Sequence, residues 1–230
     1  INSPSNPSGG VWSDDAIMQL LDIVKNRPDI WIFSDECYEQ LTYDIPFKSI
    51  ATFAPQLNNI ITFQSCSKTY AMTGWRIGYL AGDINLVKAI SKLQGQSTSC
   101  PNSIAQFAAM EALSGDQKCV QEMKQIFHER RDLILKELKK IPNVLCEVPN
   151  GAFYVFPNFK NYLNKKTPSG KLLKTSSDLS LYILDQTGVV TVAGDSFGAP
   201  EHIRLSYATS NETILKAVSL IGNTLKKIDF

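Results

Sequence analysis

The stretch Gln64-Ser-Cys-Ser-Lys-Thr-Tyr-Ala-Met-Thr-Gly-Trp-Arg-Ile-Gly78 decides the fold expected for this 230-residue chain. It follows an apolar run at 60–63, which an Asn-Asn pair and a Ser-rich exit delimit as a buried strand. Lys68 therefore lies at the mouth of a buried strand, where lysine is unusual. Ser65 and Arg76 belong to the same loop. A hydroxyl, an amine and a guanidinium so close together indicate a site for an anion and a carbonyl group.

Helical and strand patterns alternate on either side of this stretch. Ser13 is expected to cap a helix that ends near residue 26, with two aspartates in its positively polarised first turn. A short, fully apolar strand is predicted at 30–33 and another strand at 77–81. Helices flanking short apolar strands predict an α/β fold with a mostly parallel sheet.

The second half of the chain has a different pattern. The Ala-rich helix predicted at 103–113 is apolar enough to be largely buried, and a long helix at 116–140 is expected to connect two domains. We expect residues 1–118 to form the C-terminal part of a larger α/β domain. Residues 119–230 are expected to form a smaller α+β domain. The other predicted elements are a helix at 85–94, strands at 144–148 and 152–156, a solvated Lys-rich loop at 160–174, a helix at 177–186, strands at 189–193 and 203–207, and a helix at 211–227.

The composition excludes several classes of function. The 43% hydrophobic content is enough for a sizeable core, and 23 basic against 22 acidic residues give a net charge of +1. That balance offers no electrostatic reason to expect nucleic acid or membrane as a partner. No apolar run approaches the length of a membrane span. The five cysteines are odd in number and irregularly spaced, and there are two histidines, so we expect no disulfide framework, no metal centre and a cytoplasmic protein.

Two further polar residues deserve a functional interpretation because of their positions. Asp35 follows the strand at 30–33 as Lys68 follows the strand at 60–63, and ligands of open α/β sheets bind outside the carboxyl ends of strands. Taken alone, Asp35 is equally compatible with a turn or helix cap. Arg204 lies inside the strand at 203–207. Taken alone, it is more compatible with an arginine on the solvent-facing side of the strand than with a functional residue.

The pattern Ser-x-Ser-Lys, followed by Gly-Trp-Arg-x-Gly, resembles the cofactor-lysine segment of the class I aminotransferases. These are fold-type I enzymes that use pyridoxal 5'-phosphate, and the pattern is most similar to the bacterial-type aspartate aminotransferase group. The resemblance covers essentially the whole chain. It implies part of the large pyridoxal-phosphate-binding domain followed by a smaller domain. It also implies a homodimer that transfers an amino group between an amino acid, aspartate or a similar dicarboxylic one, and a 2-oxo acid.

The resemblance assigns roles to residues around Lys68. Lys68 would form the imine with the cofactor aldehyde, while Ser65 and Arg76 would bind the cofactor phosphate. Asp35 would be a buried anion that keeps the ring nitrogen protonated, which makes the ring an electron sink. Tyr38 would donate a hydrogen bond to the ring oxygen.

The resemblance also assigns residues that contact the substrate. Asn6, in Asn6-Pro-Ser-Gly9, matches an asparagine that donates to the ring oxygen and borders the substrate. Arg204 matches the arginine that binds the substrate α-carboxylate, which suits its planar fork. The segments 150–154 and 194–200 also match parts of the family that surround the substrate, although glycine-containing turns arise for backbone reasons alone.

Other interpretations remain open on the sequence. Fold does not fix the reaction, so a relative such as a carbon–sulfur lyase is one alternative, and the aminotransferase-like effector domain of a transcription regulator is another. The chain begins at Ile1, and members of the resembled family are nearly twice as long. We therefore expect a fragment that lacks the Gly-rich phosphate loop and the ring-stacking residue, and that is weak or inactive as a catalyst by itself.

Overall fold

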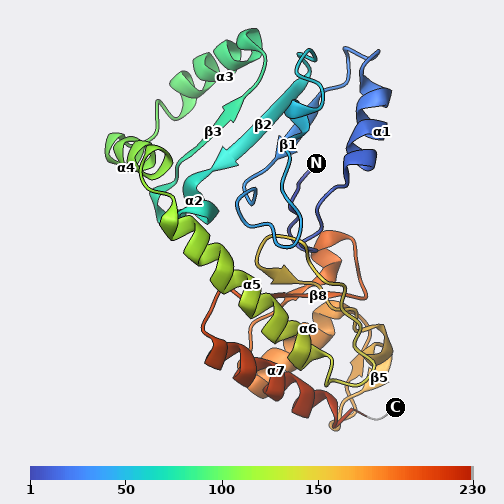
Figure 1. Cartoon of the computed structure of the whole chain (residues 1–230). Helices are drawn as coiled ribbons and strands as arrows, with labels where there is room; N and C mark the ends of the chain where they lie inside the picture. The colour runs from blue at the N-terminus through green and yellow to red at the C-terminus, as the bar shows by residue number, and fades with distance from the viewer. Residues whose placement is uncertain (229–230) are drawn as a thin grey trace. The chain divides into compact units, whose positions relative to one another are not determined.

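The computed structural model describes residues 1–228 and divides into two compact units (Figure 1). Unit 1 comprises Ile1–Ser5 and Gly10–Lys124, and unit 2 comprises Asn6–Gly9 and the chain from Gln125 onwards. The division falls inside the long helix α5 (Lys118–Leu138). The assignment of residues 1–118 and 119–230 to a large and a small family domain stays a prediction.

Unit 1 is built on a three-stranded sheet in the order β1-β2-β3. Strands β1 (Ile32–Asp35) and β2 (Ile60–Ser65) are parallel, and β3 (Gly78–Ala81) returns antiparallel to β2. Parallel strands need a long crossover connection, which the segment between β1 and β2 provides. With helices flanking this sheet, the predicted α/β class is confirmed.

Helix α1 (Asp14–Val24) covers one face of this sheet. Ser13 caps it by accepting a hydrogen bond from the amide of Ala16, as the sequence predicts. Its apolar stripe forms a core cluster with the first residues of β1 and β2 and with the short 3-10 helix η1 (Ile50–Thr52). The buried members of this cluster are Ile17, Leu21, Val24, Ile32, Ile50, Ala54 and Ile60.

Strand β1 begins two residues later than the apolar run at 30–33 predicts. The side-chain amide of Asn59 donates a hydrogen bond to the carbonyl oxygen of Ile30 at 2.6 Å. The pairing of β1 with β2 therefore starts at Ile32. The strand is also not buried on both sides, because burial alternates along it and Phe33 is 53% exposed. Phe33 packs edge-on against Phe63 on the opposite face from α1, with ring centroids 5.6 Å apart.

Helix α2 (Cys66–Thr69) and the 3-10 helix η2 (Thr73–Trp75) reverse the chain between β2 and β3. The reversal pairs Ser65 with Gly78 across the two strands. A Cβ atom at Gly78 would lie 2.7 Å from the carbonyl oxygen of Gln64, so the close strand approach requires glycine there.

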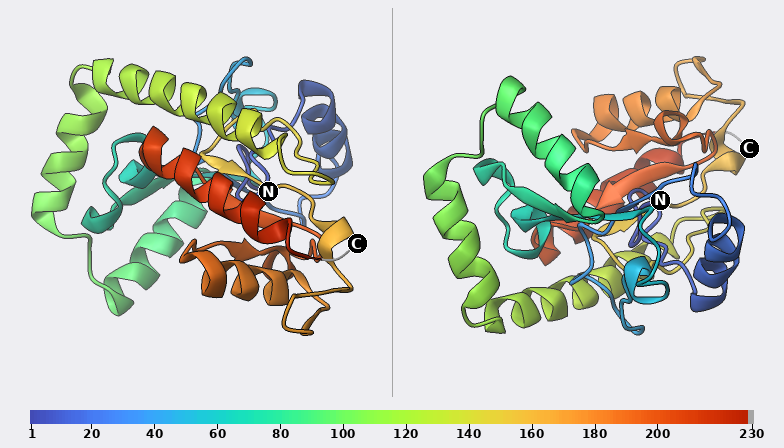
Figure 2. Two further views of the ribbon diagram at one scale, coloured as in Figure 1. Left: turned by 90° about the horizontal axis from the view of Figure 1, so that it is seen from below. Right: turned by 90° about the horizontal axis from the view of Figure 1, so that it is seen from above.

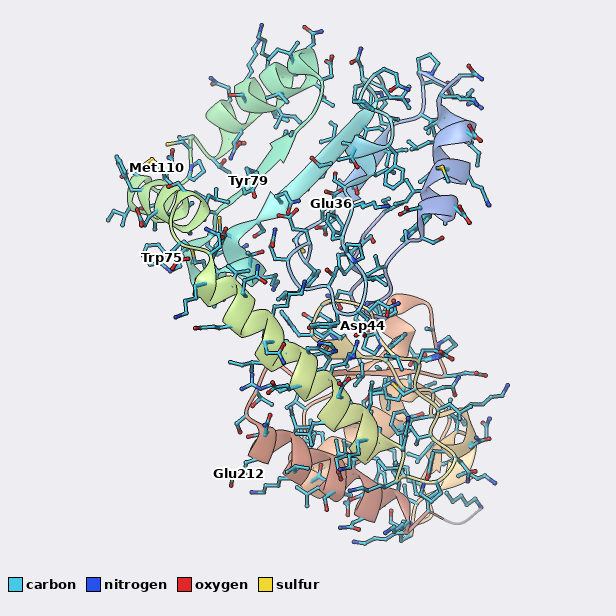
Figure 3. All side chains as sticks on the ribbon, in the orientation of Figure 1. Glu36, Asp44, Trp75, Tyr79, Met110 and Glu212 are labelled. Atoms are coloured by element: carbon cyan, nitrogen blue, oxygen red, sulfur yellow. The ribbon has the colours of Figure 1, made fainter. Side chains whose placement is uncertain are left out.

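The prediction of a largely buried helix at 103–113 is wrong. Helix α4 (Ser103–Ser114) buries Ala105 and Ala109, whereas Phe107 is 69% exposed and Met110 is 58% exposed. Figure 3 labels Met110 on this exposed side. The preceding helix α3 (Ile84–Ser97) has no buried residue. In the described residues, α4 packs into a core through Ala108, Ala109 and Ala112, which lie against Cys66 and Met72.

Unit 2 has an α+β arrangement, which follows from its antiparallel strands and separate helices. Strand β8 (Ile203–Ser206) lies between β4 (Tyr154–Val155) and β7 (Val192–Ala193) and is antiparallel to both. Helices α6 (Ser176–Thr187) and α7 (Asn211–Leu225) pack against each other, as Figure 2 shows.

Two predictions for unit 2 are wrong, and the strands predicted at 152–156 and 189–193 are limited to two residues each, in β4 and β7. Residues 144–148 form no strand, because Leu145 makes a single bridge to Asn158 and is 74% exposed. The Lys-rich segment 160–174 is not a plain solvated loop. It contains the 3-10 helix η3 (Lys160–Tyr162) and a hairpin of β5 (Lys165–Lys166) with β6 (Leu172–Leu173). Leu173 is fully buried, which gives this charged segment its own anchor.

No helix within residues 1–228 has both the length and the apolar composition needed to cross a bilayer. The same residues contain no cluster of three or more His, Cys, Asp or Glu side chains that could hold a metal ion.

Replacing Leu21 with alanine should test the core beneath the sheet. Leu21 is 7% exposed in the α1 cluster, so we expect the Leu21→Ala variant to lose about 3 kcal/mol of unfolding free energy. Ile23→Ala is the matched control, because Ile23 is on the same helix and 64% exposed. Urea unfolding followed by tryptophan fluorescence reports on unit 1, since Trp12, Trp31 and Trp75 all belong to it. Equal losses in both variants would contradict the packing described.

Candidate active site

The predicted site residues fall into two groups, and the first gathers at one edge of the unit 1 sheet. Asp35 ends β1, and its Cα partner in the parallel ladder is Phe63 of β2. Ser65 ends β2 and caps α2, whose last turn carries Lys68. Because β1 and β2 are parallel, Asp35 and Lys68 both lie at the carboxyl edge of the sheet.

Lys68, Tyr38 and Cys37 are close neighbours at this edge. The Lys68 amine is half-buried and lies 6.0 Å from the centre of the Tyr38 ring. Burial raises the pKa of the Cys37 thiol to about 12, and the negative charge of Asp35 adds to this rise while Lys68 opposes it. The Asp35 anion and the Lys68 amine are therefore both within electrostatic reach of the Cys37 thiol.

Asp35 differs from its expected environment, because its side chain is exposed rather than buried. Its backbone is nevertheless fixed. Ile1 accepts a hydrogen bond from the Asp35 amide at 2.9 Å, and Ser3 donates its amide to the Asp35 carbonyl at 3.1 Å. The carboxylate accepts a hydrogen bond from the amide of Cys37 at 3.2 Å. The strand end is thus held in place while the carboxylate remains accessible at its tip.

Glu36 is the buried carboxyl group at this edge, and the sequence analysis missed it. It is 2% exposed and accepts hydrogen bonds at one oxygen from the Ser34 hydroxyl, the Ser49 hydroxyl and the Ile50 amide, at 2.9, 3.0 and 3.2 Å. Burial raises its pKa despite these donors. Glu36, labelled in Figure 3, ties η1 to the end of β1 and so fixes the ends of the segment that carries Tyr38.

Ser65 and Arg76 are held by their own loop. The Ser65 hydroxyl accepts a hydrogen bond from the Ser67 amide at 3.1 Å and donates one to the Ile77 carbonyl at 3.4 Å. Arg76 adopts a left-handed backbone conformation, is exposed and donates to the Thr73 carbonyl at 2.9 Å. It lines a cavity of about 620 Å³ that Asn102 also borders. Their role as a phosphate pair stays a prediction.

The second group of predicted residues lies in unit 2 around Arg204. Arg204 is half-buried on β8 and donates a hydrogen bond from Nη1 to Oδ1 of Asn6 at 2.7 Å. Its guanidinium lies over the Tyr154 ring at 4.6 Å and the Phe197 ring at 5.2 Å. Cation–π contacts of this kind hold an arginine in one orientation. Both aromatic residues belong to the segments 150–154 and 194–200 that the sequence marks as matching the family.

Known proteins with similar sequences and structures show which family this chain belongs to. The family model for aminotransferase class I and II matches residues 1–221. The chain belongs to this family. The resemblance inferred from the segment around Lys68 is therefore confirmed. Aminotransferases of class I and II generally depend on pyridoxal phosphate.

Two relatives and one solved structure illustrate how similar this family member is to others. A Rhizobium leguminosarum bv. phaseoli protein described as a probable aspartate/prephenate aminotransferase is 45% identical over 218 residues, which is 94% of this chain and 54% of that protein. The aspartate aminotransferase of Rhizobium meliloti strain 1021 is 43% identical, over 96% of this chain and 55% of the relative. The crystal structure of the Rhizobium meliloti aspartate aminotransferase superimposes with a TM-score of 0.95 at 41% identity. The superposition covers 100% of this chain and 58% of the crystallised chain. The chain thus spans about half the length of the relatives it matches.

Alkylation of Cys37 should report on the charges at the sheet edge. Since the thiolate is the reactive form and the pKa of Cys37 is about 12, iodoacetamide should modify Cys37 slowly at pH 8, faster with each rise in pH. Asp35→Asn removes an anion that raises this pKa, so it should accelerate alkylation. Lys68→Met removes a cation that lowers the pKa, so it should slow alkylation. Peptide mass spectrometry over time measures both rates.

The opposite signs of the two variants separate charge from accessibility. A change in loop packing alone would shift both rates in the same direction, and that outcome would contradict the proximity of Asp35 and Lys68 to Cys37. The exposed Cys100 provides an internal reference in every sample.

Proposed function

We propose that the protein containing this chain transfers an amino group between an amino acid and a 2-oxo acid, with pyridoxal 5'-phosphate attached at Lys68. The observation that carries the proposal is the gathering of Asp35, Tyr38 and Lys68 at the carboxyl edge of the sheet. When bound, the cofactor supplies a protonated ring that accepts electrons from the substrate α-carbon.

The donor set at this edge fits that cofactor. A planar ring with a basic nitrogen needs an anion, which Asp35 offers from the fixed end of β1. A ring oxygen needs a hydrogen-bond donor, and Tyr38, whose ring centre lies 6.0 Å from the Lys68 amine, carries a hydroxyl that can donate. Ser65 and Arg76 flank the α2–η2 reversal and supply a neutral and a cationic group for phosphate. Asp35 must become covered in the working protein, because a carboxylate exposed to water interacts more weakly with a ring nitrogen.

The environment of Cys37 favours Lys68 as the reactive nucleophile. A thiolate so close to Lys68 would compete for an aldehyde. Because the pKa of Cys37 is about 12, its thiol stays protonated near neutral pH and is a poor nucleophile. The Lys68 amine is then left to attach the cofactor and, once released by the incoming amino acid, to take the proton from the substrate α-carbon at Nζ.

Arg204 is proposed to bind the substrate α-carboxylate, and Asn6 to serve beside it. A guanidinium only donates hydrogen bonds, so its contact with Asn6 fixes the amide with Oδ1 toward Arg204. The amide nitrogen of Asn6 is therefore turned away from Arg204. The donor role of Asn6 toward the cofactor ring oxygen is proposed from the family resemblance.

Aspartate, or a similar dicarboxylic amino acid, is the proposed amino donor. Relatives named as aspartate aminotransferases support this substrate class. The family is generally dimeric, and we propose a cytoplasmic homodimer for the complete protein.

Borohydride trapping should test the attachment site. The protein expressed from its complete gene is mixed with pyridoxal phosphate, reduced and digested, and we expect the label on the peptide that contains Lys68. Lys68→Ala should lose the label and reduce turnover about a hundredfold or more, because the proton-transferring amine is gone. Lys88→Ala, at an exposed lysine of α3, is the control and should keep both.

The substrate assay then separates this proposal from its competitors. Turnover that requires a 2-oxo acid acceptor supports transamination. Release of sulfide or ammonia from cysteine without an acceptor would instead identify a lyase, and labelling elsewhere than Lys68 would refute the proposed attachment site.

Expressed alone, residues 1–230 should show no measurable transaminase turnover. Asp35 and Arg76 are exposed in this chain, so the ring nitrogen and the phosphate would be held mainly in contact with water, where ionic interactions are weak. A coupled assay for the 2-oxo acid product measures this, with circular dichroism showing that the chain is folded. Full turnover by the folded chain would contradict the interpretation.

A further inference from the structure

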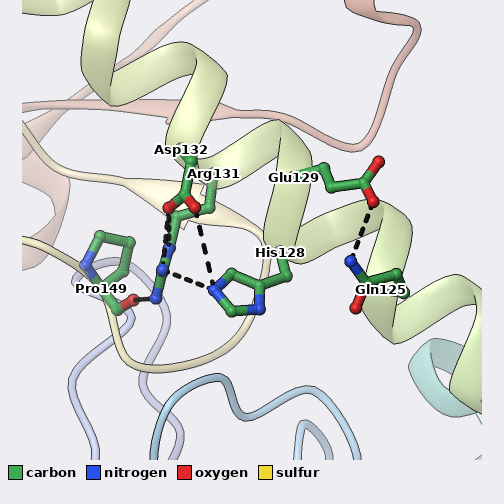
Figure 4. Close-up of polar contacts among 6 residues, drawn as sticks. All are labelled: Gln125, His128, Glu129, Arg131, Asp132 and Pro149. Atoms are coloured by element: carbon green, nitrogen blue, oxygen red, sulfur yellow. Dashed lines mark hydrogen bonds and ion pairs between the residues drawn. The ribbon is translucent and has the colours of Figure 1, made fainter.

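Arg131 is a buried cation in unit 2 with no role in the function proposed above. It lies on α5 and is 4% exposed, although an arginine is rarely buried without specific partners. Its Nε donates to the Asp132 carboxylate at 2.9 Å, and Nη2 lies 2.8 Å from the same oxygen (Figure 4). Asp132 is mostly exposed, so this pair alone gives no reason for placing the guanidinium in the interior.

Two further contacts of Arg131 connect it to other parts of unit 2. Nη1 donates to the carbonyl oxygen of Pro149 at 3.3 Å, and Nη2 lies 2.8 Å from Nε2 of His128. Because a guanidinium has no acceptor, His128 must accept at Nε2 and carry its proton on Nδ1. His128, one turn earlier on α5, thus orients the fork so that its other arm reaches Pro149.

Pro149 begins a turn that packs directly on the loop carrying Asn6. The Gly151 amide donates to the Gly9 carbonyl at 2.9 Å. Gly9 has a φ of +69°, and a Cβ atom there would lie 2.3 Å from the Cβ of Pro149. The two loops therefore touch with no space for a side chain, and a shift of Pro149 must move Gly9.

Each of the two loops positions a residue that contacts Arg204. The Asn6–Gly9 loop supplies the amide oxygen that accepts from Arg204 at 2.7 Å. The chain that leaves the Pro149 turn reaches Tyr154, whose ring underlies the Arg204 guanidinium at 4.6 Å. Two independent contacts of Arg204 thus depend on where the Pro149 turn is held.

We propose that Arg131 is a positioning residue for Arg204, acting through the Pro149 turn on Asn6 and Tyr154. The inference rests on the proposed function of Arg204 as the ligand of the substrate carboxylate. Displacing the turn changes the direction of the Arg204 fork, and a bidentate contact with a carboxylate depends on that direction. The covalent bond to the cofactor is formed by Lys68, which belongs to unit 1. Within this set of contacts, Asn6 is proposed to donate a hydrogen bond to the ring oxygen, and no residue of the set forms that covalent bond.

The test is steady-state kinetics on the complete holoenzyme. Arg131→Met keeps the length of the side chain but removes its donors, and we expect KM for both the amino acid and the 2-oxo acid to rise about tenfold. We expect kcat to change less than threefold and borohydride labelling of Lys68 to be unchanged. Lys136→Met removes one cation from an exposed position on the same helix and should leave KM unaltered.

A second pair of variants perturbs Arg131 without emptying its site. His128→Ala removes the acceptor at Nη2 and should raise KM about threefold, whereas His128→Gln offers a replacement oxygen and should restore KM. This pattern of loss and rescue distinguishes orientation of Arg131 from general destabilisation, and it applies even if Arg131→Met fails to fold.

Arg204→Lys separates the two levels of the proposal. If Arg204→Lys raises KM but Arg131→Met and His128→Ala do not, the positioning role is overturned and the carboxylate role stands. If Arg204→Lys leaves KM unchanged, the proposed function of Arg204 itself fails. A loss of Lys68 labelling in Arg131→Met would show that Arg131 acts on the fold as a whole and would also overturn the inference.

Discussion

Parallel pairing of β1 with β2 is the constraint on which the proposed cofactor-binding group depends. It brings the ends of two strands to one edge, so that Asp35 and the helix carrying Lys68 follow neighbouring strands. A shift of β1 by one residue would turn Asp35 toward the core and Ile32 toward solvent. The apolar cluster beneath α1 includes Ile32 and therefore opposes such a shift. The position of the polar edge is set by apolar packing on the opposite face.

Two adjacent carboxyl groups at this edge, Asp35 and Glu36, lie in different environments. Glu36 is buried, and three donors converge on one of its oxygens, which joins η1 to the strand end. Asp35 has its carboxylate at the surface and its backbone pinned. Asp35 is the last residue of β1 and Glu36 follows it, so the two carboxyl groups lie in different environments although they are neighbours in the chain. The buried group stabilises the loop and the exposed group remains available for a ligand.

What the sequence predicted correctly was local, and what it missed depended on distant partners. Strand ends and helix caps, such as Ser13 over α1, follow from short patterns. The start of β1 was misplaced because Asn59, far along the chain, captures the Ile30 carbonyl. Helix α4 was expected to be buried because its composition is apolar, but composition does not say which face meets a partner. A buried leucine, Leu173, likewise makes a hairpin of a segment whose lysines indicated a loop.

The same distinction applies to the two groups of site residues. Lys68 and Arg76 lie in one short loop, so their joint motif is legible in a single stretch of sequence. Asn6 and Arg204 are separated by 198 residues and meet through a folded unit. No spacing rule predicts such a contact, because it depends on Gly9 fitting against Pro149 without a side chain. The orientation of Arg204 is therefore a property of the packing of unit 2, to which Arg131 on α5 contributes through its contact with Pro149.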